Sequence, residues 1–221
     1  MEPALETRSS KPETASDYFS VFSLPRKLTL DSAQLEKDFY SQSRKLHPDR
    51  FAGKSMEEQE RATEQSSLLN DAYRTLKDPV ARTEYLLSLE GVNMEEQSRA
   101  ATDSARESGT EKKQVVPPEL LEEVFEMNMQ LQEMKMAHEM GEAPDPDTQR
   151  GLEAARANFQ AKLSGIDEVL KAQWKRWDAM LDSGTADGEK KTEVRDAMVE
   201  ILNRRNYVRN LVRDVSAALE A

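Results

Sequence analysis

Residues 31–51, DSAQLEKDFYSQSRKLHPDRF, combine one amphipathic helix with a polar turn that ends it. Asp31 is a good N-cap, because its carboxylate can accept hydrogen bonds from the first free backbone N–H groups of a helix. The apolar residues that follow at helical spacing are Leu35, Phe39 and Leu46. Pro48 stops this pattern and disfavours a helical backbone at His47. The stretch predicts a helix over residues 32–46 and, after it, a loop that carries His-Pro-Asp.

The segments on either side of this stretch complete a helical domain. Residues 17–25, DYFSVFSLP, are rich in apolar side chains and predict a short helix or an apolar plug. A second long helix is predicted over residues 56–76 from its apolar side chains, which are Ala62, Leu69, Ala72, Tyr73 and Leu76. Asp78 and Pro79 then begin a short helix that Gly91 ends.

The second half of the chain predicts three further helices. One spans residues 119–140, and Asp147 is the predicted N-cap of the next, which has an apolar stripe repeated every three or four residues. The stripe consists of Leu152, Ala155, Phe159, Leu163, Ile166, Leu170, Trp174, Trp177 and Leu181. A last helix follows through residues 194–219. We therefore expect an antiparallel three-helix bundle with both tryptophans in its core.

Two segments lack the apolar residues that a packed helix needs. Residues 1–15 contain no apolar block and are expected to form a disordered tail. Residues 95–114 contain Ser, Thr, Gly and mixed charges without one large apolar residue, so we expect a linker over residues 92–114. The predicted fold is therefore all-α, with a helical-hairpin domain at 16–91 and a three-helix domain at 115–221.

Composition excludes several classes of function. The 221 residues contain 31 Lys and Arg against 42 Asp and Glu, so the net charge of -11 argues against nucleic acid or an anionic membrane as a partner. The absence of cysteine excludes disulfides, thiolate metal sites and a cysteine nucleophile. No apolar run approaches the roughly 20 residues of a membrane-spanning helix. His47 and Asp49 are too few ligands for a metal site, and the other histidine, His138, is distant in sequence.

The segments around His-Pro-Asp follow one known pattern. DYFSVFSLP at residues 17–25 is followed by LDSAQLEKDFYSQSRKLHPDRF at 30–51 and by SSLLNDAYRTLKDPVARTEYLLSLEG at 66–91. His-Pro-Asp alone is typical of an ordinary turn at the end of a helix. Together with these flanks it resembles the J domain of the HscB-type co-chaperones of iron–sulfur cluster assembly.

The resemblance implies a docking role for the loop. The residues expected to engage the ATPase domain of a DnaK- or HscA-type heat-shock chaperone, and to stimulate its ATP hydrolysis, are His47, Pro48, Asp49, Arg44, Lys45 and Arg50. Their charge agrees with this role, because residues 44–54 carry four basic side chains against one acid, a net +3 in a chain of -11. The ATP chemistry belongs to the chaperone, so we expect neither catalysis nor a cofactor in this chain.

The helix over residues 119–140 has two apolar stripes. One is formed by Leu120, Val124, Met127, Leu131 and Met134, and the other by Leu121, Phe125, Met129 and Met136. The second stripe is either buried against another helix or exposed as a partner-binding face. HscB-type proteins bind an IscU-type iron–sulfur scaffold protein here, and the resemblance implies contacts from Leu121, Phe125, Glu126, Glu133 and Tyr207. Glu122 and Met129 depart from the family pattern, which has an apolar residue and an acid at these positions.

These observations predict a two-domain adaptor that delivers a scaffold protein to its chaperone in a bacterial-type cytoplasm. Two alternatives stay open: a J-domain co-chaperone with a different client, and a structural helical scaffold whose His-Pro-Asp turn is incidental. Scaffold binding by residues 115–221 distinguishes the first alternative, and stimulation of the chaperone ATPase distinguishes the second.

Overall fold

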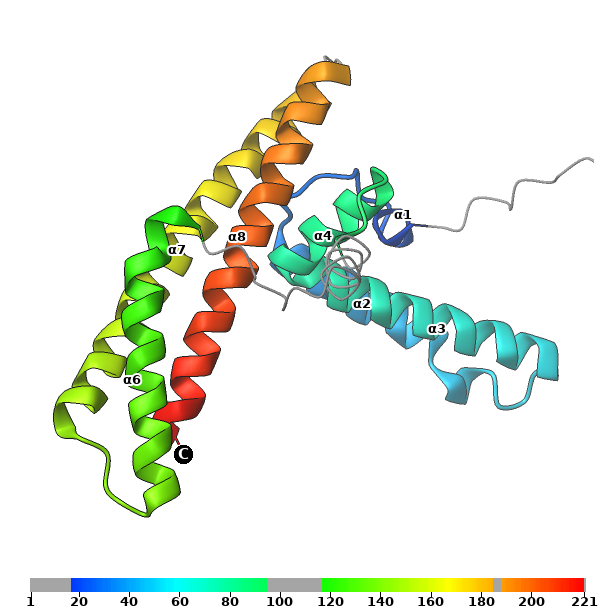
Figure 1. The fold of residues 1–221 in the computed structure, drawn as a ribbon. Coiled ribbons are helices and arrows are strands. Elements are labelled where there is room, and N and C mark those ends of the chain that lie inside the picture. The colour runs from blue at the N-terminus through cyan, green and yellow to red at the C-terminus, as the bar shows by residue number, and fades with distance from the viewer. Residues whose placement is uncertain (1–16, 95–116, 185–187, 221) are drawn as a thin grey trace, which may run out of the picture. The chain divides into compact units, whose positions relative to one another are not determined.

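The computed structural model describes residues 17–94, 117–184 and 188–220, and every regular element in these ranges is helical (Figure 1). The all-α fold class predicted from the sequence is therefore confirmed. The predicted tail at 1–15 and the linker residues 95–114 lie outside the described residues. The chain divides into two compact units between Leu86 and Leu87. None of the described helices is long and apolar enough to cross a membrane.

The described part of the first unit is built from short and long helices in sequence. Their bounds are α1 Tyr18–Val21, α2 Ser32–Leu46, η1 Pro48–Arg50, α3 Met56–Lys77 and α4 Pro79–Leu89, where η1 is a single 3-10 turn and the division between the units falls within α4. α2 and α3 confirm the two long helices predicted from the sequence. The run at 17–25 forms a short helix, α1, as one of its two interpretations predicted.

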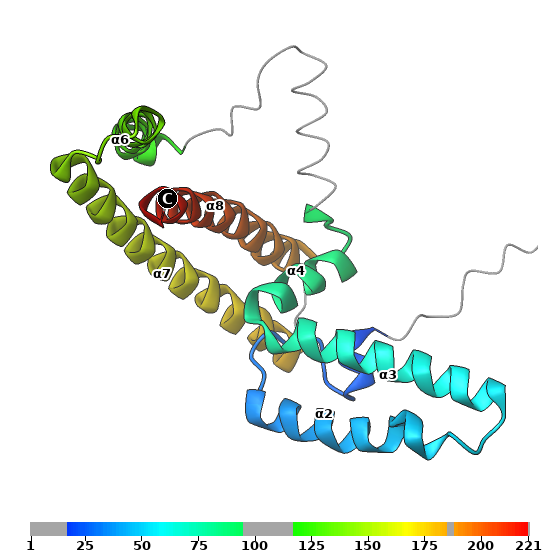
Figure 2. The same cartoon turned by 90° about the horizontal axis from the view of Figure 1, so that it is seen from below.

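α2 and α3 lie side by side as a hairpin (Figures 1 and 2). The ring of Phe39 on α2 stacks on the ring of Tyr73 on α3, with 4.1 Å between the ring centroids. The Tyr73 hydroxyl donates to the Glu36 carboxylate at 3.3 Å, and the Lys77 ammonium lies 3.8 Å from the same carboxylate. The buried core of this unit consists of Phe19, Phe22, Leu28, Leu35, Ala62, Leu69, Ala72, Leu76 and Leu86.

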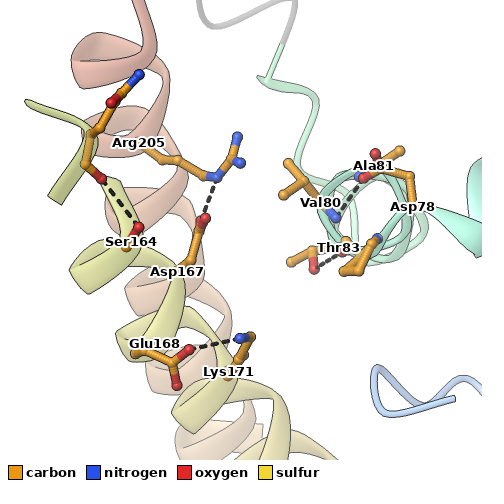
Figure 3. A network of polar contacts seen from close by, with 11 residues as sticks. Asp78, Val80, Ala81, Thr83, Ser164, Asp167, Glu168, Lys171 and Arg205 are labelled. Atoms are coloured by element: carbon orange, nitrogen blue, oxygen red, sulfur yellow. Dashed lines mark hydrogen bonds and ion pairs between the residues drawn. The ribbon is translucent and has the colours of Figure 1, made fainter. Parts of the chain in front are cut away.

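Capping groups determine where these helices begin and end. The Asp31 carboxylate accepts hydrogen bonds from two backbone N–H groups in the first turn of α2, at 2.9 and 3.1 Å, as predicted. Asp78 does the same for α4, at 2.8 and 2.9 Å (Figure 3). Gly91 follows α4 with a φ of 82°, a left-handed conformation that glycine adopts without a Cβ clash.

The second unit contains an antiparallel three-helix bundle, as predicted (Figure 1). Its elements are η2 Pro118–Leu120, α6 Leu121–Met140, α7 Pro146–Ser183 and α8 Gly188–Glu220. One cluster of buried residues joins the three helices, formed by Leu120, Val124, Met127, Met134, Leu152, Phe159, Ile166, Tyr207, Val208, Leu211 and Val215. An ion pair supports the packing of α7 on α8, in which Arg205 donates to Asp167 at 2.6 Å (Figure 3).

α6 is much shorter than its two neighbours. It has 20 residues, whereas α7 has 38 and α8 has 33. The buried cluster that α6 shares with them extends along α7 only as far as Ile166. Farther along α7, Trp174 and Trp177 are 9% and 2% exposed, so the predicted burial of both tryptophans is confirmed. The stripe does not stay buried to its end, because Leu181 is 37% exposed.

The start of α7 differs from the sequence-based prediction. Asp147 was expected to cap this helix, but the N-cap is Asp145, whose carboxylate accepts a hydrogen bond from the Asp147 N–H at 3.2 Å. Pro146 is the first helical residue, because its fixed φ and missing N–H suit that position. Asp147 instead lies in the first turn and pairs with Arg150.

Two phenylalanines of the bundle provide a matched test of this fold. Phe159 is fully buried, whereas Phe125 is 66% exposed. Phe159→Ala should lower the free energy of unfolding of the bundle by about 3–5 kcal/mol, because it leaves a cavity among packed helices. Phe125→Ala should cost less than about 1 kcal/mol. Urea unfolding followed by circular dichroism measures both, and equal losses would contradict the described packing.

Candidate functional site

The His-Pro-Asp loop joins α2 to α3 at the end of their hairpin (Figure 2). α2 ends at Leu46, and His47 follows with an extended backbone, φ -60° and ψ 131°. The Arg50 N–H then donates to the His47 carbonyl at 3.0 Å, which closes the η1 turn. Because Pro48 cannot continue α2, the chain leaves the helix immediately before the three residues of the motif.

The far end of the loop is held by a capping box at the start of α3. The Ser55 N–H donates to the Glu58 carboxylate at 3.1 Å, and the Glu58 N–H donates to the Ser55 hydroxyl at 3.3 Å. Hydrogen bonds from the backbone and hydroxyl of Ser55 hold the pKa of the Glu58 carboxyl below its usual range. Both ends of the loop are therefore fixed by the helices that it connects.

His47 and Asp49 are exposed on this loop and contact each other. Their side chains are 58% and 88% exposed. The Asp49 N–H lies within 3.4 Å of His47 Nδ1 as a donor, and the Asp49 carboxylate is 3.4 Å from the same nitrogen. Nδ1 acts as an acceptor in the first contact and as a donor in the second, so the two contacts need different proton positions on the ring of His47. When Nδ1 accepts from the Asp49 N–H, Nε2 carries the ring proton and can donate it to a partner.

Basic side chains gather next to the loop. Arg44 and Lys45 lie exposed in the last turn of α2, where cations complement the partial negative charge of a helix C-terminus. The Arg50 guanidinium reaches back from η1 and donates to the Arg44 carbonyl at 3.4 Å. The structure therefore brings the three predicted cations together with His47 and Asp49 at one end of the hairpin.

α6 turns its two apolar stripes to different environments. Of the first stripe, Leu120, Val124, Met127 and Met134 are buried and Leu131 is partly buried. In the second, Leu121 is 60% exposed, Phe125 66%, Met129 51% and Met136 47%. The interpretation that this second stripe is buried against another helix is therefore wrong for the described structure.

Met140 extends the second stripe and was missed by the sequence analysis. It is 68% exposed and lies four residues after Met136, so the same helical spacing would have identified it. We call these exposed residues the outer face of α6: Leu121, Phe125, Met129, Met136 and Met140. The outer face contains half of the exposed large apolar residues of the described chain, gathered on one helix.

Acidic residues border the outer face. Glu122 and Glu126 are exposed on α6, and so is Glu133, whose carboxylate accepts a hydrogen bond from the Thr148 hydroxyl on α7 at 3.0 Å. This bond fixes Glu133 at the edge between α6 and α7. An apolar centre with a polar or charged rim is the usual composition of a protein-binding surface.

Tyr207 does not belong to this surface. Its side chain is 7% exposed and packs in the buried cluster with Val208 and Leu211. Burial also raises the pKa of the Tyr207 hydroxyl above its ordinary value. The expectation that Tyr207 contacts a partner beside Leu121 and Phe125 is therefore not supported by its position on the inner side of α8.

Comparison with known proteins identifies the first unit. Residues 17–85 match the DnaJ domain family, with the His-Pro-Asp loop inside the matched range. These residues form a J domain. The loop of the J domain is thus the exposed, basic-flanked turn between α2 and α3.

Curated relatives match part of this chain. The "Co-chaperone protein HscB" of Proteus mirabilis is 42% identical over 89 residues, which cover 40% of this chain and 51% of that protein. The "Co-chaperone protein HscB homolog" of Vibrio cholerae is 45% identical over 78 residues, which cover 35% of this chain and 46% of that protein. The chain therefore spans about half the length of the curated relatives that it matches.

Two solved structures share the fold over nearly the whole chain. HscB from Vibrio cholerae superposes with a TM-score of 0.54 at 24% identity, covering 92% of this chain and 98% of that one. Human co-chaperone protein HscB gives a TM-score of 0.59 at 22% identity, covering 98% and 93%. At this identity the likeness establishes the fold. Together with the curated relatives, it confirms the resemblance to HscB-type J-domain co-chaperones.

Proposed function

We propose that this chain is a co-chaperone of iron–sulfur cluster assembly. It stimulates the ATPase of a DnaK- or HscA-type chaperone through the J domain and delivers an IscU-type scaffold protein through the outer face of α6. The observation that carries the proposal is the presence of two exposed surfaces of different chemistry, one in each compact unit. The proposed division is a J domain at 16–91, a linker at 92–114 and a client-binding domain at 115–221.

The J-domain surface has the chemistry needed to dock on an acidic partner. Arg44, Lys45 and Arg50 supply positive charge that attracts the partner over a distance and orients its approach. Asp49 is the exposed acid among them and can accept charge-assisted hydrogen bonds from a cation on the chaperone. His47 adds a ring donor. None of these groups acts on ATP, so the proposal assigns hydrolysis to the chaperone and only its stimulation to this chain.

The outer face of α6 has the chemistry needed to bind a folded protein client. Leu121 and Phe125 are large, exposed and one helical turn apart, so they can enter pockets on a partner together. Glu126 and Glu133 border them and would pair with basic groups of the scaffold. Tyr207 is left out of the proposed contacts because it is buried.

Joining the two surfaces in one chain explains how a protein without catalysis can act. A scaffold bound to the second unit is held near a chaperone bound to the first, so its effective concentration at the chaperone rises. The named relatives from Proteus and Vibrio support a bacterial-type cytoplasm as the place of action. A J-domain co-chaperone with another client remains the second candidate, and scaffold binding decides between them.

Asp49→Asn and His47→Gln should each abolish stimulation of the chaperone ATPase. Their free energies of unfolding should stay within about 1 kcal/mol of the parent chain, because exposed loop substitutions rarely affect folding. Steady-state phosphate release measures stimulation, and circular dichroism measures stability. Glu60→Gln, a substitution at an exposed acid of α3, is the matched control and should stimulate normally. Normal stimulation by both loop variants would leave only a structural role for the motif.

Arg44→Ala combined with Lys45→Ala should weaken association with the chaperone, and the loss should shrink as salt rises, because screening already removes the long-range attraction. The control is Arg61→Ala with Arg74→Ala, which removes the same charge from exposed positions of α3. Affinity measured at about 0.05 and 0.5 M salt tests the point. A loss that is the same at both salt concentrations would indicate packing contacts in place of electrostatic attraction.

Leu121→Ser combined with Phe125→Ser should raise the Kd for the scaffold at least about tenfold, since exposed anchors of this kind commonly contribute over 1 kcal/mol each. Scaffold-free stimulation of the chaperone should not change. Titration calorimetry with an IscU-type scaffold measures the Kd, and differential scanning calorimetry checks folding. Val169→Ser, at an exposed apolar residue of α7, is the control. A folded double variant that binds normally would reject the outer face as the client site.

A further inference from the structure

Methionine is concentrated in α6. Five of the ten methionines of the chain lie in its 20 residues, and they divide between its two faces. Met127 and Met134 are 3% and 9% exposed, within the core. Met129, Met136 and Met140 are 51%, 47% and 68% exposed on the outer face. Met198 on α8 is fully buried and Met180 on α7 is partly buried, so the exposed thioethers of the described bundle gather on this face.

We propose that Met129, Met136 and Met140 form a site of reversible oxidation by hydrogen peroxide that regulates client binding. The thioether sulfur attacks one oxygen of the peroxide, the O–O bond breaks, and a sulfur–oxygen bond forms. The sulfur loses two electrons to the peroxide, and the second oxygen leaves as hydroxide, which takes the proton from the sulfur-bound oxygen and becomes water. A methionine sulfoxide reductase restores the thioether with two electrons and two protons from a pair of thiols, which become a disulfide while the sulfoxide oxygen leaves as water.

The composition of the chain favours methionine as the target. Because there is no cysteine, no thiolate competes for peroxide, and the methionine thioethers are the sole sulfur atoms available. Accessibility then decides among them, since a buried thioether is shielded from peroxide by its neighbours. The three outer-face methionines are exposed without any opening of the bundle, so oxidation at these positions leaves the core intact.

Oxidation changes the property on which the outer face depends. A thioether is apolar and adaptable, whereas a sulfoxide is polar and accepts hydrogen bonds. Met129 lies one helical turn from Phe125, and Met136 and Met140 continue the stripe at helical spacing. Three sulfoxides would place polar oxygen atoms along the apolar centre of the surface. This regulatory step rests on the proposed function, because it requires that the outer face binds the scaffold.

The first experiment treats the full chain with graded hydrogen peroxide and maps sulfoxides by peptide mass spectrometry. Oxidation should occur first at Met129, Met136, Met140 and the 78%-exposed Met56 of the J domain. Met127, Met134 and Met198 should follow at least about tenfold more slowly, while the circular dichroism spectrum stays unchanged. Equal rates at buried and exposed methionines, or unfolding at the first oxidation step, would overturn the proposal.

The second experiment measures scaffold affinity before and after oxidation. Oxidised chain should bind at least about tenfold more weakly, with recovery after treatment with methionine sulfoxide reductase. Met129→Leu with Met136→Leu and Met140→Leu should bind before treatment and resist peroxide, because leucine keeps the apolar surface without an oxidisable sulfur. Met56→Leu is the matched control and should lose affinity on oxidation as the parent does.

The outcomes separate the inference from the proposed function. Unchanged affinity of the oxidised parent, or peroxide-induced loss of affinity in the triple leucine variant, would overturn the regulatory site. Failure of the untreated parent to bind the scaffold would overturn the proposed client instead. Scaffold-free stimulation of the chaperone ATPase should survive oxidation in the Met56→Leu variant, because neither the J-domain loop nor the start of α3 then contains a methionine.

Discussion

The stacking of Phe39 on Tyr73, 4.1 Å apart, keeps α2 against α3, and the shape of the J-domain loop depends on this contact. With the two helices held together, the loop must connect two nearby helix ends. Pro48 ends one helix and the Ser55–Glu58 capping box begins the other, so little freedom remains for the residues between them. The exposed position of His47 and Asp49 is therefore a consequence of packing elsewhere in the hairpin.

In the bundle, helix packing likewise determines which side chains stay exposed. α6 carries more apolar surface than two neighbouring helices can cover, and its packing on α7 and α8 uses only the stripe of Val124, Met127 and Met134. The second stripe, which lies about 100° around the helix from the first, stays exposed. Exposed apolar area of this kind lowers solubility, so it is expected to persist in a protein only where a partner covers it. The surplus apolar surface of α6 is thus the feature on which the proposed client binding rests.

The sequence predicted those parts of the structure that depend on local rules. Asp31 and Asp78 cap helices because they precede apolar periodic segments, and both α2 and α3 follow the expected bounds. The prediction of Asp147 as the N-cap was wrong because three acids stand near the start of α7, and Pro146 favours the one directly before it, Asp145. The exposure of the second stripe could not be predicted, since periodicity shows which residues share a face but not how many helices will pack on it. The burial of Tyr207 could not be predicted for the same reason, because it depends on the packing of α6 and α7.

The separation of the two exposed surfaces has a genetic consequence. A chain whose loop is inactivated would fold, escape quality control and accumulate to normal levels, because Asp49 is 88% exposed and contributes little to stability. Under the proposed function, such a chain would still hold its client through α6 without passing it on. In a cell that also makes the intact protein, the defective copies would sequester the scaffold. Loop alleles should therefore be dominant-negative, whereas alleles at the fully buried Phe159 should be recessive, because their product is removed before it can compete.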